Sequence, residues 1–310
     1  MKMLVVGAGA IGGYFGGRLL EAGRDVTFLV RARRASQLAT HGLTIRSPAG
    51  DYHAPQPATV SADTLRERYD LVLLSCKAYD LEAAIEAVAP AVGPSTVVLP
   101  LLNGMRHLDV LERRFGAATV FGGQCVISAM VDDLGRIVHL NQIHALSFGE
   151  RDGSRSARAT RLAAILGGAR FDAHLSDAIV QEMWEKWVFI ATLAGITCLM
   201  RASIGDIVAA GGTDATTRLL DECSRIAAAE GHAPRDASLR RNAAMLTAAN
   251  STLSASMLRD VERGSDTEAE HIVGDLLRRG GSAGASPELL RIAYLHLAAY
   301  EARRRRLAAA

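Results

Sequence analysis

Residues 3–12 are MLVVGAGAIG, and this stretch decides the fold. Its first four residues are apolar and predict a buried strand, and its glycines have the spacing G-x-G-x-x-G. The residues that follow, 12–22, have the periodicity of a helix. A strand, a glycine-rich turn and a helix in this order are typical of a dinucleotide-binding domain, in which the diphosphate lies at the helix N-terminus. The predicted cofactor-binding residues of the turn are Gly7, Ala8, Gly9, Ala10, Ile11 and Gly12.

Short apolar runs continue this pattern through the first half of the chain. The further predicted strands are residues 26–30, 71–75, 96–100, 119–122, 137–140 and 144–148. Such runs suit strands that are buried on both faces of a parallel sheet. Residues 80–88, between two of these strands, have helical periodicity. The alternation predicts an α/β fold with a Rossmann-like, doubly wound parallel sheet.

The second half of the chain is predicted to be helical. Its predicted helices are residues 176–200, 214–230, 238–250, 254–263, 268–279 and 287–306. The glycine-rich residues 280–284 predict a loop between the last two of them. We therefore expect two domains: a dinucleotide-binding, Rossmann-like domain over residues 1–173, and an all-helical domain over residues 174–310.

Composition and charge narrow the class of protein. The chain has 310 residues, of which 49% are hydrophobic and 22% charged, a balance typical of a globular protein. The 35 Lys and Arg against 33 Asp and Glu give a net charge of +2, so no global field favours a nucleic acid or an acidic membrane. Residues 187–200 form an apolar run that is too short to span a bilayer, which predicts a buried helix.

Cysteine and histidine spacing predicts no metal site. The four cysteines have no metal-ligand spacing and are expected to be reduced structural thiols: Cys76, Cys125, Cys198 and Cys223. His139 and His144 lie five residues apart in a predicted strand region, with no third ligand nearby. The chain begins directly with the first strand, without a cleavable apolar segment, so a cytoplasmic location is expected.

The end of the second strand distinguishes NADP from NAD. An NAD site places a carboxylate about 20 residues after the glycines, where it binds the ribose 2′-hydroxyl. Here Arg31 stands nineteen residues after Gly12, and Arg33 and Arg34 follow it. A guanidinium can bind a 2′-phosphate through two hydrogen bonds. The sequence therefore predicts NADPH/NADP as cofactor, with Arg31 as the main 2′-phosphate ligand; the alternative is that these arginines form only a solvated face.

At this point the sequence resembles the ketopantoate reductase (2-dehydropantoate 2-reductase) family. The resemblance rests on short motifs in the same order over nearly the whole chain, namely the glycine turn with Arg31, residues 76–79 (CKAY), 102–105 (LNGM), 185–186 (EK), 256–260 (SMLRD) and 267–268 (TE). It implies reduction of a 2-keto acid to a 2-hydroxy acid by NADPH. It also implies a Rossmann-like domain followed by a helical one, with the substrate bound between them.

The resemblance implies catalytic roles for Lys186 and Glu268. Lys186 would be the general acid that protonates the developing alkoxide, and desolvation in an apolar segment would lower its pKa towards neutrality. Thr267 and Glu270 have the spacing of a capping box, which predicts Glu268 in the first turn of a helix. There Glu268 would orient Lys186 and contact the substrate hydroxyl or the nicotinamide ribose. A salt-bridged lysine and a plain helix-start glutamate are the structural alternatives.

Further binding roles follow from the same resemblance. Asn103 would bind both cofactor and substrate, Lys77 would bind the cofactor, and Ser256 would bind the substrate carboxylate. Because Ser256 and Glu268 are twelve residues apart, they can share a face only if Gly264 and Ser265 break the helix, which we expect. For each of these residues the alternative is an ordinary turn or surface position.

The chain departs from the family pattern in its predicted substrate pocket. Members of the family carry asparagines four and eight residues after the catalytic lysine and three residues before the serine. The corresponding residues here are Ile190, Ala194 and Leu253. Three missing amides remove hydrogen bonds to a polar substrate, so a more hydrophobic 2-keto acid is an alternative to 2-dehydropantoate.

Two other functions are alternatives to a 2-dehydropantoate reductase of pantothenate biosynthesis. A two-domain 3-hydroxy acid dehydrogenase also uses a lysine on a helix, and an NADP(H)-binding sensor could have lost turnover together with the asparagines. We expect a small-molecule 2-keto acid as the partner, with no nucleic acid and no membrane. The sequence leaves a homodimer open.

Overall fold

The computed structural model describes residues 1–282 and 287–308 and forms two compact units. The first unit contains Met1–Leu102 and His107–Val180, and the second contains Asn103–Arg106 and Gln181–Ala310. The division falls later than the expected boundary at residue 173. The reason is β10 (Asp172–Leu175), which pairs with β9 (Ile137–Gly149) and so belongs to the first unit.

A parallel sheet of five strands carries the amino-terminal motif. Its order is β5 (Ala58–Val60), β2 (Asp25–Leu29), β1 (Lys2–Val6), β6 (Leu71–Leu74) and β7 (Val97–Pro100), and neighbouring strands are parallel throughout. β6 and β7 are buried along their whole length, as expected of strands covered on both faces. The strand expected at residues 119–122 is wrong: Ala117–Thr119 is a 3-10 turn, and Val120 forms only an isolated bridge to Val98.

A second, mixed sheet completes the first unit. Its order is β10, β9, β3 (Leu43–Arg46) and β4 (Tyr52–Ala54), and β8 (Gly122–Val131) pairs antiparallel with β9. The two strands expected over residues 137–148 are therefore one long strand, β9. The sequence pattern does not predict β3, β4, β5, β8 and β10, which are short or partly polar.

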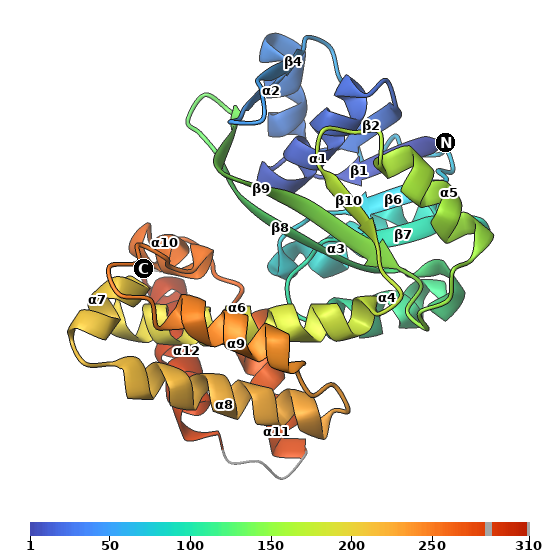
Figure 1. Cartoon of the computed structure of the whole chain (residues 1–310). Helices are drawn as coiled ribbons and strands as arrows, with labels where there is room; N and C mark the ends of the chain where they lie inside the picture. Colours follow the sequence, from blue (N-terminus) through green and yellow to red (C-terminus); the bar gives the residue numbers. More distant parts are fainter. Residues whose placement is uncertain (283–286, 309–310) are drawn as a thin grey trace. The chain divides into compact units, whose positions relative to one another are not determined.

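Helix α1 (Ala10–Glu21) joins the two sheets (Figure 1). It contacts strands of both, and glycines on its surface let them approach closely. A Cβ on Gly16 would lie 2.6 Å from the Phe28 ring, and one on Gly13 would lie 2.7 Å from Ile137. The other helices of this unit are α2 (Ala32–His41), α3 (Leu81–Val88), α4 (Arg106–Phe115) and α5 (Ala157–Leu166).

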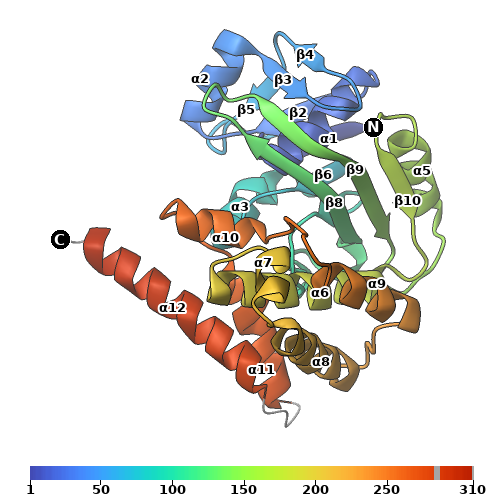
Figure 2. The same ribbon diagram turned by 60° about the vertical axis from the view of Figure 1, so that its left-hand side comes forward.

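The second unit is helical over its described residues. Its helices are α6 (Ile179–Met200), α7 (Ile204–Ala209), α8 (Thr213–Ala229), α9 (Asp236–Leu246), α10 (Ser256–Glu262), α11 (Asp275–Ser282) and α12 (Glu288–Ala308). A π-helical turn, Glu270–Gly274, directly precedes α11. Helices α11 and α12 lie side by side, and α8 contacts both (Figure 2). The loop expected at residues 280–284 is wrong over Gly280–Ser282, which continue α11, and its last two residues lie outside the described part.

Helix α6 is the core of this unit. It has 22 residues, so it is longer than its apolar run and long enough in principle to cross a membrane. However, 72% of its most apolar window is buried inside the protein, as in the core helix of a globular domain. Burial, and not length, is therefore the observation that supports the prediction of a buried helix.

Candidate functional site

The glycine turn lies between β1 and α1, at the carboxyl end of the parallel sheet. Gly7 has φ +89°, which favours glycine, and its N–H donates to the Leu29 carbonyl at 2.9 Å. A Cβ on Gly12 would lie 2.2 Å from the Gly7 carbonyl oxygen and 2.2 Å from the Ser75 hydroxyl oxygen. The turn can close against the helix only with glycine at this position.

The turn also fits the diphosphate of a dinucleotide. No protein atom lies within 4 Å of a Cβ built on Gly9, so its backbone is open to a ligand. Gly9 is the N-cap of α1, and the first turn of α1 contains no acidic residue. The N–H groups and the dipole at this helix start favour an anion. Gly7, Gly9 and Gly12 thus give the turn a backbone conformation and an open surface that suit a diphosphate.

Arg31 lies at the same edge of the sheet, directly before α2. Its side chain is 78% exposed, and its guanidinium donates to the Asp80 carboxylate at 2.5 Å. This hydrogen bond raises the pKa of Arg31 above its ordinary value. The carboxylate that meets Arg31 therefore comes from a distant part of the sequence, because Asp80 is 49 residues away along the chain.

Asp80 reaches Arg31 through the topology of the sheet. The 3-10 turn Ala78–Asp80 follows β6, while Arg31 follows β2, and both strands neighbour β1. Lys77, the predicted cofactor lysine, is exposed and directly precedes the same turn. Arg34 reaches the glycine turn by donating to the Ala8 carbonyl at 3.0 Å.

In the helical unit, α6 carries Lys186 among buried apolar residues. Lys186 is half-buried, and its neighbour Trp187 is completely buried. Ile190 and Ala194 follow at steps of four residues and so share its face; Ile190 is half-buried and Ala194 is buried. The neighbouring Glu185 is paired elsewhere, since it accepts from Arg235 at 2.7 Å.

Glu268 lies at the start of the π-helical turn and is only 9% exposed. Its backbone carbonyl accepts hydrogen bonds from the N–H groups of His271 and Ile272, which makes it the helix-start residue. The expected capping box between Thr267 and Glu270 is wrong. Instead, Glu301 of α12 accepts from both the N–H and the hydroxyl of Thr267, at 2.8 and 2.7 Å.

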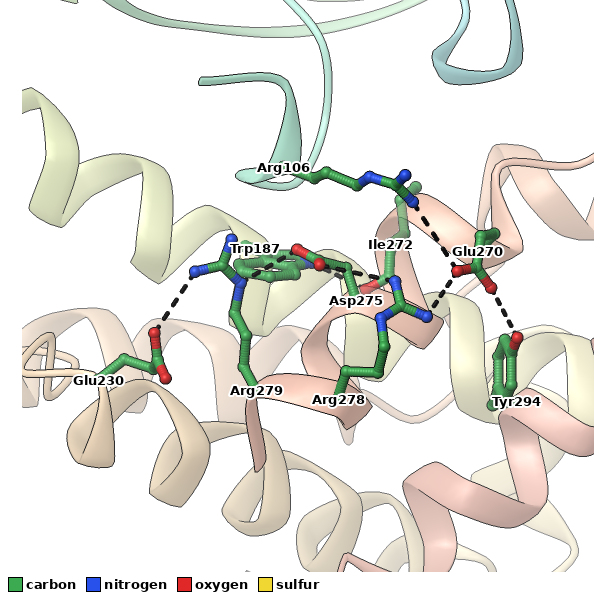
Figure 3. Close-up of polar contacts among 9 residues, drawn as sticks. All are labelled: Arg106, Trp187, Glu230, Glu270, Ile272, Asp275, Arg278, Arg279 and Tyr294. Atoms are coloured by element: carbon green, nitrogen blue, oxygen red, sulfur yellow. Dashed lines mark hydrogen bonds and ion pairs between the residues drawn. The ribbon is translucent and has the colours of Figure 1, made fainter. Parts of the chain in front are cut away.

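A buried hydrogen bond joins the segment after Glu268 to α6. The indole N–H of Trp187 donates to the Ile272 carbonyl at 2.8 Å (Figure 3). The residue directly after Lys186 is therefore fixed to a carbonyl four residues after Glu268. From the sequence alone, Trp187 is recognisable only as an apolar neighbour of Lys186.

Asn103 joins the same turn from the first half of the chain. It is half-buried, and its backbone forms a hydrogen bond with the buried side chain of His271. Gly104 has φ +80°, and a Cβ on it would lie 2.9 Å from the His271 carbonyl oxygen. Burial lowers the pKa of His271 below its ordinary value, although Glu268 and Asp275 oppose this effect.

Ion pairs hold the outer side of the π-helical turn (Figure 3). Glu270 accepts from Arg278 at 2.5 Å and from the Tyr294 hydroxyl at 2.6 Å, and the Arg106 guanidinium lies 3.9 Å from it. Asp275 and Glu230 hold Arg279 at 3.1 and 3.4 Å. The turn is thus fixed by side chains from several helices.

Ser256 is the first residue of α10, and its side chain is exposed. The N–H of Ala255 bonds to the Thr197 hydroxyl of α6 at 3.4 Å, which fixes the start of α10 to the core helix. The expected break after α10 is confirmed, because α10 ends at Glu262 and Gly264 has φ +70°. Leu253 is half-buried, and its carbonyl accepts from the Ile204 N–H at 2.9 Å.

Several cysteine and histidine side chains outside the predicted site are buried or hydrogen-bonded to other parts of the protein. Burial raises the pKa of the Cys198 and Cys223 thiols to about 12. His144 is hydrogen-bonded to the Tyr14 hydroxyl at 2.6 Å, and His139 to the Ser47 hydroxyl at 2.9 Å, so both are satisfied as expected. Over residues 1–282 and 287–308, no group of three or more His, Cys, Asp or Glu side chains could hold a metal ion.

A glycine turn on a parallel sheet and a helical unit with a half-buried lysine define the class of two-domain, nicotinamide-dependent oxidoreductases. Comparison with known proteins gives the family. The family model "Ketopantoate reductase PanE/ApbA" matches residues 3–153, and "Ketopantoate reductase PanE/ApbA C terminal" matches residues 178–301. The chain therefore belongs to the ketopantoate reductase family and is an NADP-dependent oxidoreductase that acts on a CH–OH group.

Individual relatives cover almost the whole chain. The uncharacterized oxidoreductase YkpB of Bacillus subtilis (strain 168) is 38% identical, over 97% of this chain and 99% of that protein. The crystal structure of 2-dehydropantoate 2-reductase from Methylococcus capsulatus is 27% identical, with a TM-score of 0.86 and 98% of each chain covered. A ternary structure of D-mandelate dehydrogenase with NADH and anilino(oxo)acetate is 22% identical, with a TM-score of 0.88 over 98% of this chain and 100% of that one, and this likeness shows the fold alone.

Proposed function

We propose that this protein reduces a 2-keto acid to the 2-hydroxy acid with NADPH, with Lys186 as the general acid. The observation that supports this best is the surroundings of Lys186. It is half-buried next to the fully buried Trp187, which donates a hydrogen bond to the Ile272 carbonyl, four residues after Glu268. A lysine ammonium within reach of the carbonyl oxygen can donate the proton that completes the reduction.

The other predicted residues would bind and orient the substrate. The bound nicotinamide would supply the hydride that reduces the carbonyl carbon, and Lys186 would protonate the oxygen. Glu268 would accept a hydrogen bond from the substrate hydroxyl or the nicotinamide ribose. Asn103 can both donate and accept, which suits a bridge between ribose and substrate. Ser256 would bind the carboxylate. Arg31 and Lys77 would hold the 2′-phosphate side of the cofactor.

The family points to 2-dehydropantoate as the first substrate to test. This would place the protein in pantothenate biosynthesis, in the cytoplasm. The apolar residues at the predicted pocket favour a second candidate, a reductase of a more hydrophobic 2-keto acid. Ile190 and Ala194 share the face of Lys186, and neither can donate a hydrogen bond to a polar substrate.

A substrate panel tests both candidates. Loss of NADPH absorbance is followed with 2-dehydropantoate, with branched and aromatic 2-keto acids, and with a 3-keto acid as a control. The highest kcat/KM with 2-dehydropantoate would support the first candidate, and the highest kcat/KM with a bulkier 2-keto acid would support the second. Preference for the 3-keto acid, or NADPH binding without turnover of any substrate, would overturn the proposal.

A further inference from the structure

The cofactor site contains an acidic group that the resemblance did not assign. The Asp80 carboxylate accepts a hydrogen bond from Arg31, the predicted ligand of the 2′-phosphate, at 2.5 Å. Asp80 is 32% exposed and Arg31 is 78% exposed, so solvent and ligands can reach both. The first turn of α2, which follows Arg31, contains no acidic residue. The carboxylate that meets Arg31 thus comes from the end of a different strand.

We propose that Asp80 sets the preference between NADPH and NADH. The 2′-phosphate of NADPH competes with Asp80 for the Nη2 donor of Arg31, whereas the 2′-hydroxyl of NADH can donate to the Asp80 carboxylate. This inference rests on the part of the proposed function that places the adenosine ribose at Arg31.

The physical basis is competition for one guanidinium. The Asp80 carboxylate occupies the Nη2 donor of Arg31, so a phosphate that binds the same edge of the guanidinium competes with it. A carboxylate that remains close to a bound phosphate dianion repels it. By contrast, an acidic side chain at the end of the second strand is the usual acceptor for the ribose 2′-hydroxyl in NAD sites. Asp80 offers this acceptor from the neighbouring side of β1.

The topology supports this role. Arg31 follows β2, Asp80 follows β6, and both strands pair with β1, which leads into the glycine turn. The pair therefore lies at the same edge of the sheet as the predicted diphosphate site. In addition, Asp80 is only three residues after Lys77, so a positive and a negative group are presented by one short segment.

The test compares Asp80→Asn with a matched surface variant, Glu86→Gln. Glu86 of α3 pairs with Arg114 at 3.2 Å and is 72% exposed, so this change also removes one negative charge and one exposed ion pair of the same unit. Dissociation constants for NADPH and NADH are measured by titration of the intact protein. An exposed ion pair is weak, so we expect the ratio of the NADH constant to the NADPH constant to rise about 3- to 10-fold in Asp80→Asn.

Arg31→Ala separates the inference from the proposed function. If Arg31 binds the 2′-phosphate, this variant loses NADPH affinity while NADH affinity changes little. An unchanged preference in Asp80→Asn, together with a lost preference in Arg31→Ala, would overturn the role of Asp80 alone. Equal shifts in Asp80→Asn and Glu86→Gln would overturn it as well, since net charge would then explain both. An unchanged preference in Arg31→Ala would overturn the assignment of the 2′-phosphate to Arg31, and with it the inference.

Discussion

The two units fix their candidate site residues in different ways. In the first unit the backbone forms the site: a turn with Gly7 at positive φ, an open Gly9, and strand ends that bring Arg31 and Asp80 together. In the second unit side chains form it, through the Trp187–Ile272 hydrogen bond and the contact of His271 with the backbone of Asn103. The glycines of the first site form a motif whose backbone role can be inferred from the sequence, whereas the long-range bonds of the second site cannot.

The largest expected effect tests whether proton donation depends on Lys186 of the second unit, independently of cofactor binding at the glycine turn of the first. Lys186→Ala should lower kcat at least about 100-fold, or about 2.7 kcal/mol, because the general acid is lost. NADPH affinity should remain close to that of the unchanged protein, because the glycine turn is untouched. Steady-state kinetics and cofactor titration measure the two quantities.

Lys186→Arg is the matched control for this prediction. A guanidinium keeps the positive charge but does not give up its proton near neutral pH, so kcat should remain low. If Lys186→Arg restored turnover, the role of Lys186 would be charge alone. Near-full turnover in Lys186→Ala would remove this residue from the mechanism.

The difference between local sequence patterns and long-range contacts also explains which parts of the fold the sequence predicts. The strands of the parallel sheet at residues 2–6, 25–29, 71–74 and 97–100 are rich in buried apolar residues, and the sequence predicts them within one or two residues. The second sheet was largely missed, because β3 and β4 are short and β8 mixes buried and exposed residues. Periodicity alone carries little information on such strands.

The candidate site divides in the same way. The glycine turn was predicted because each glycine meets a local backbone requirement. Asp80 was missed because it reaches Arg31 across 49 residues, and the bond from Trp187 to Ile272 spans 85 residues. His271 offered a weak signal, since it stands three residues after Glu268 on the predicted helix. Long-range pairs of this kind depend on the tertiary fold and not on local spacing.

The next effect in size concerns the glycine turn of the first unit. Gly9→Ala should weaken NADPH binding at least about 10-fold, because the new methyl group enters the space needed by the diphosphate. It should leave the thermal midpoint nearly unchanged, since no protein atom lies within 4 Å of that methyl group. Gly12→Ala is the paired variant and should lower both the NADPH affinity and the thermal midpoint, because its Cβ would lie 2.2 Å from the Gly7 carbonyl oxygen.

Cofactor titration and thermal unfolding of the two variants decide this prediction. Tight NADPH binding by Gly9→Ala would mean that the diphosphate does not approach this backbone. An unchanged thermal midpoint in Gly12→Ala would show that the turn can open without cost.

A smaller effect concerns the hydrogen bond from the Trp187 side chain in the second unit. Trp187→Phe keeps a buried ring but leaves the Ile272 carbonyl without its indole donor, which should cost about 1 kcal/mol of the free energy of unfolding. Because the bond links α6 to the segment after Glu268, kcat should fall several-fold while KM for NADPH stays constant. Urea unfolding and steady-state kinetics test both expectations.

Trp184→Phe is the control for Trp187→Phe. Trp184 is also buried, at 3% exposure, and its ring stacks on His232 at 5.2 Å. It should lose stability through packing without the same loss of kcat. Equal losses of kcat in the two variants would mean that general packing, and not the bond to Ile272, supports turnover.

The smallest effect depends on pH and concerns His271. Burial lowers its pKa in the folded protein, so the unfolded chain binds this proton more readily. The stability from the neutral ring is therefore present above the unfolded pKa of about 6.5 and is lost as the pH falls below it. His271→Gln removes the titration, so less stability should be lost between about pH 7.5 and 5 than in the unchanged protein.

His232→Gln distinguishes a local role from a general one. Burial also lowers the pKa of His232, but the ring of this residue stacks on Trp184. Both variants should flatten the pH dependence of stability, whereas only His271→Gln should alter the acid limb of kcat/KM, because only His271 contacts the backbone of Asn103. The same acid limb in both variants would mean that the ring of His271 stabilises the fold without positioning Asn103. The second unit would then resemble the first, with the backbone alone placing that residue.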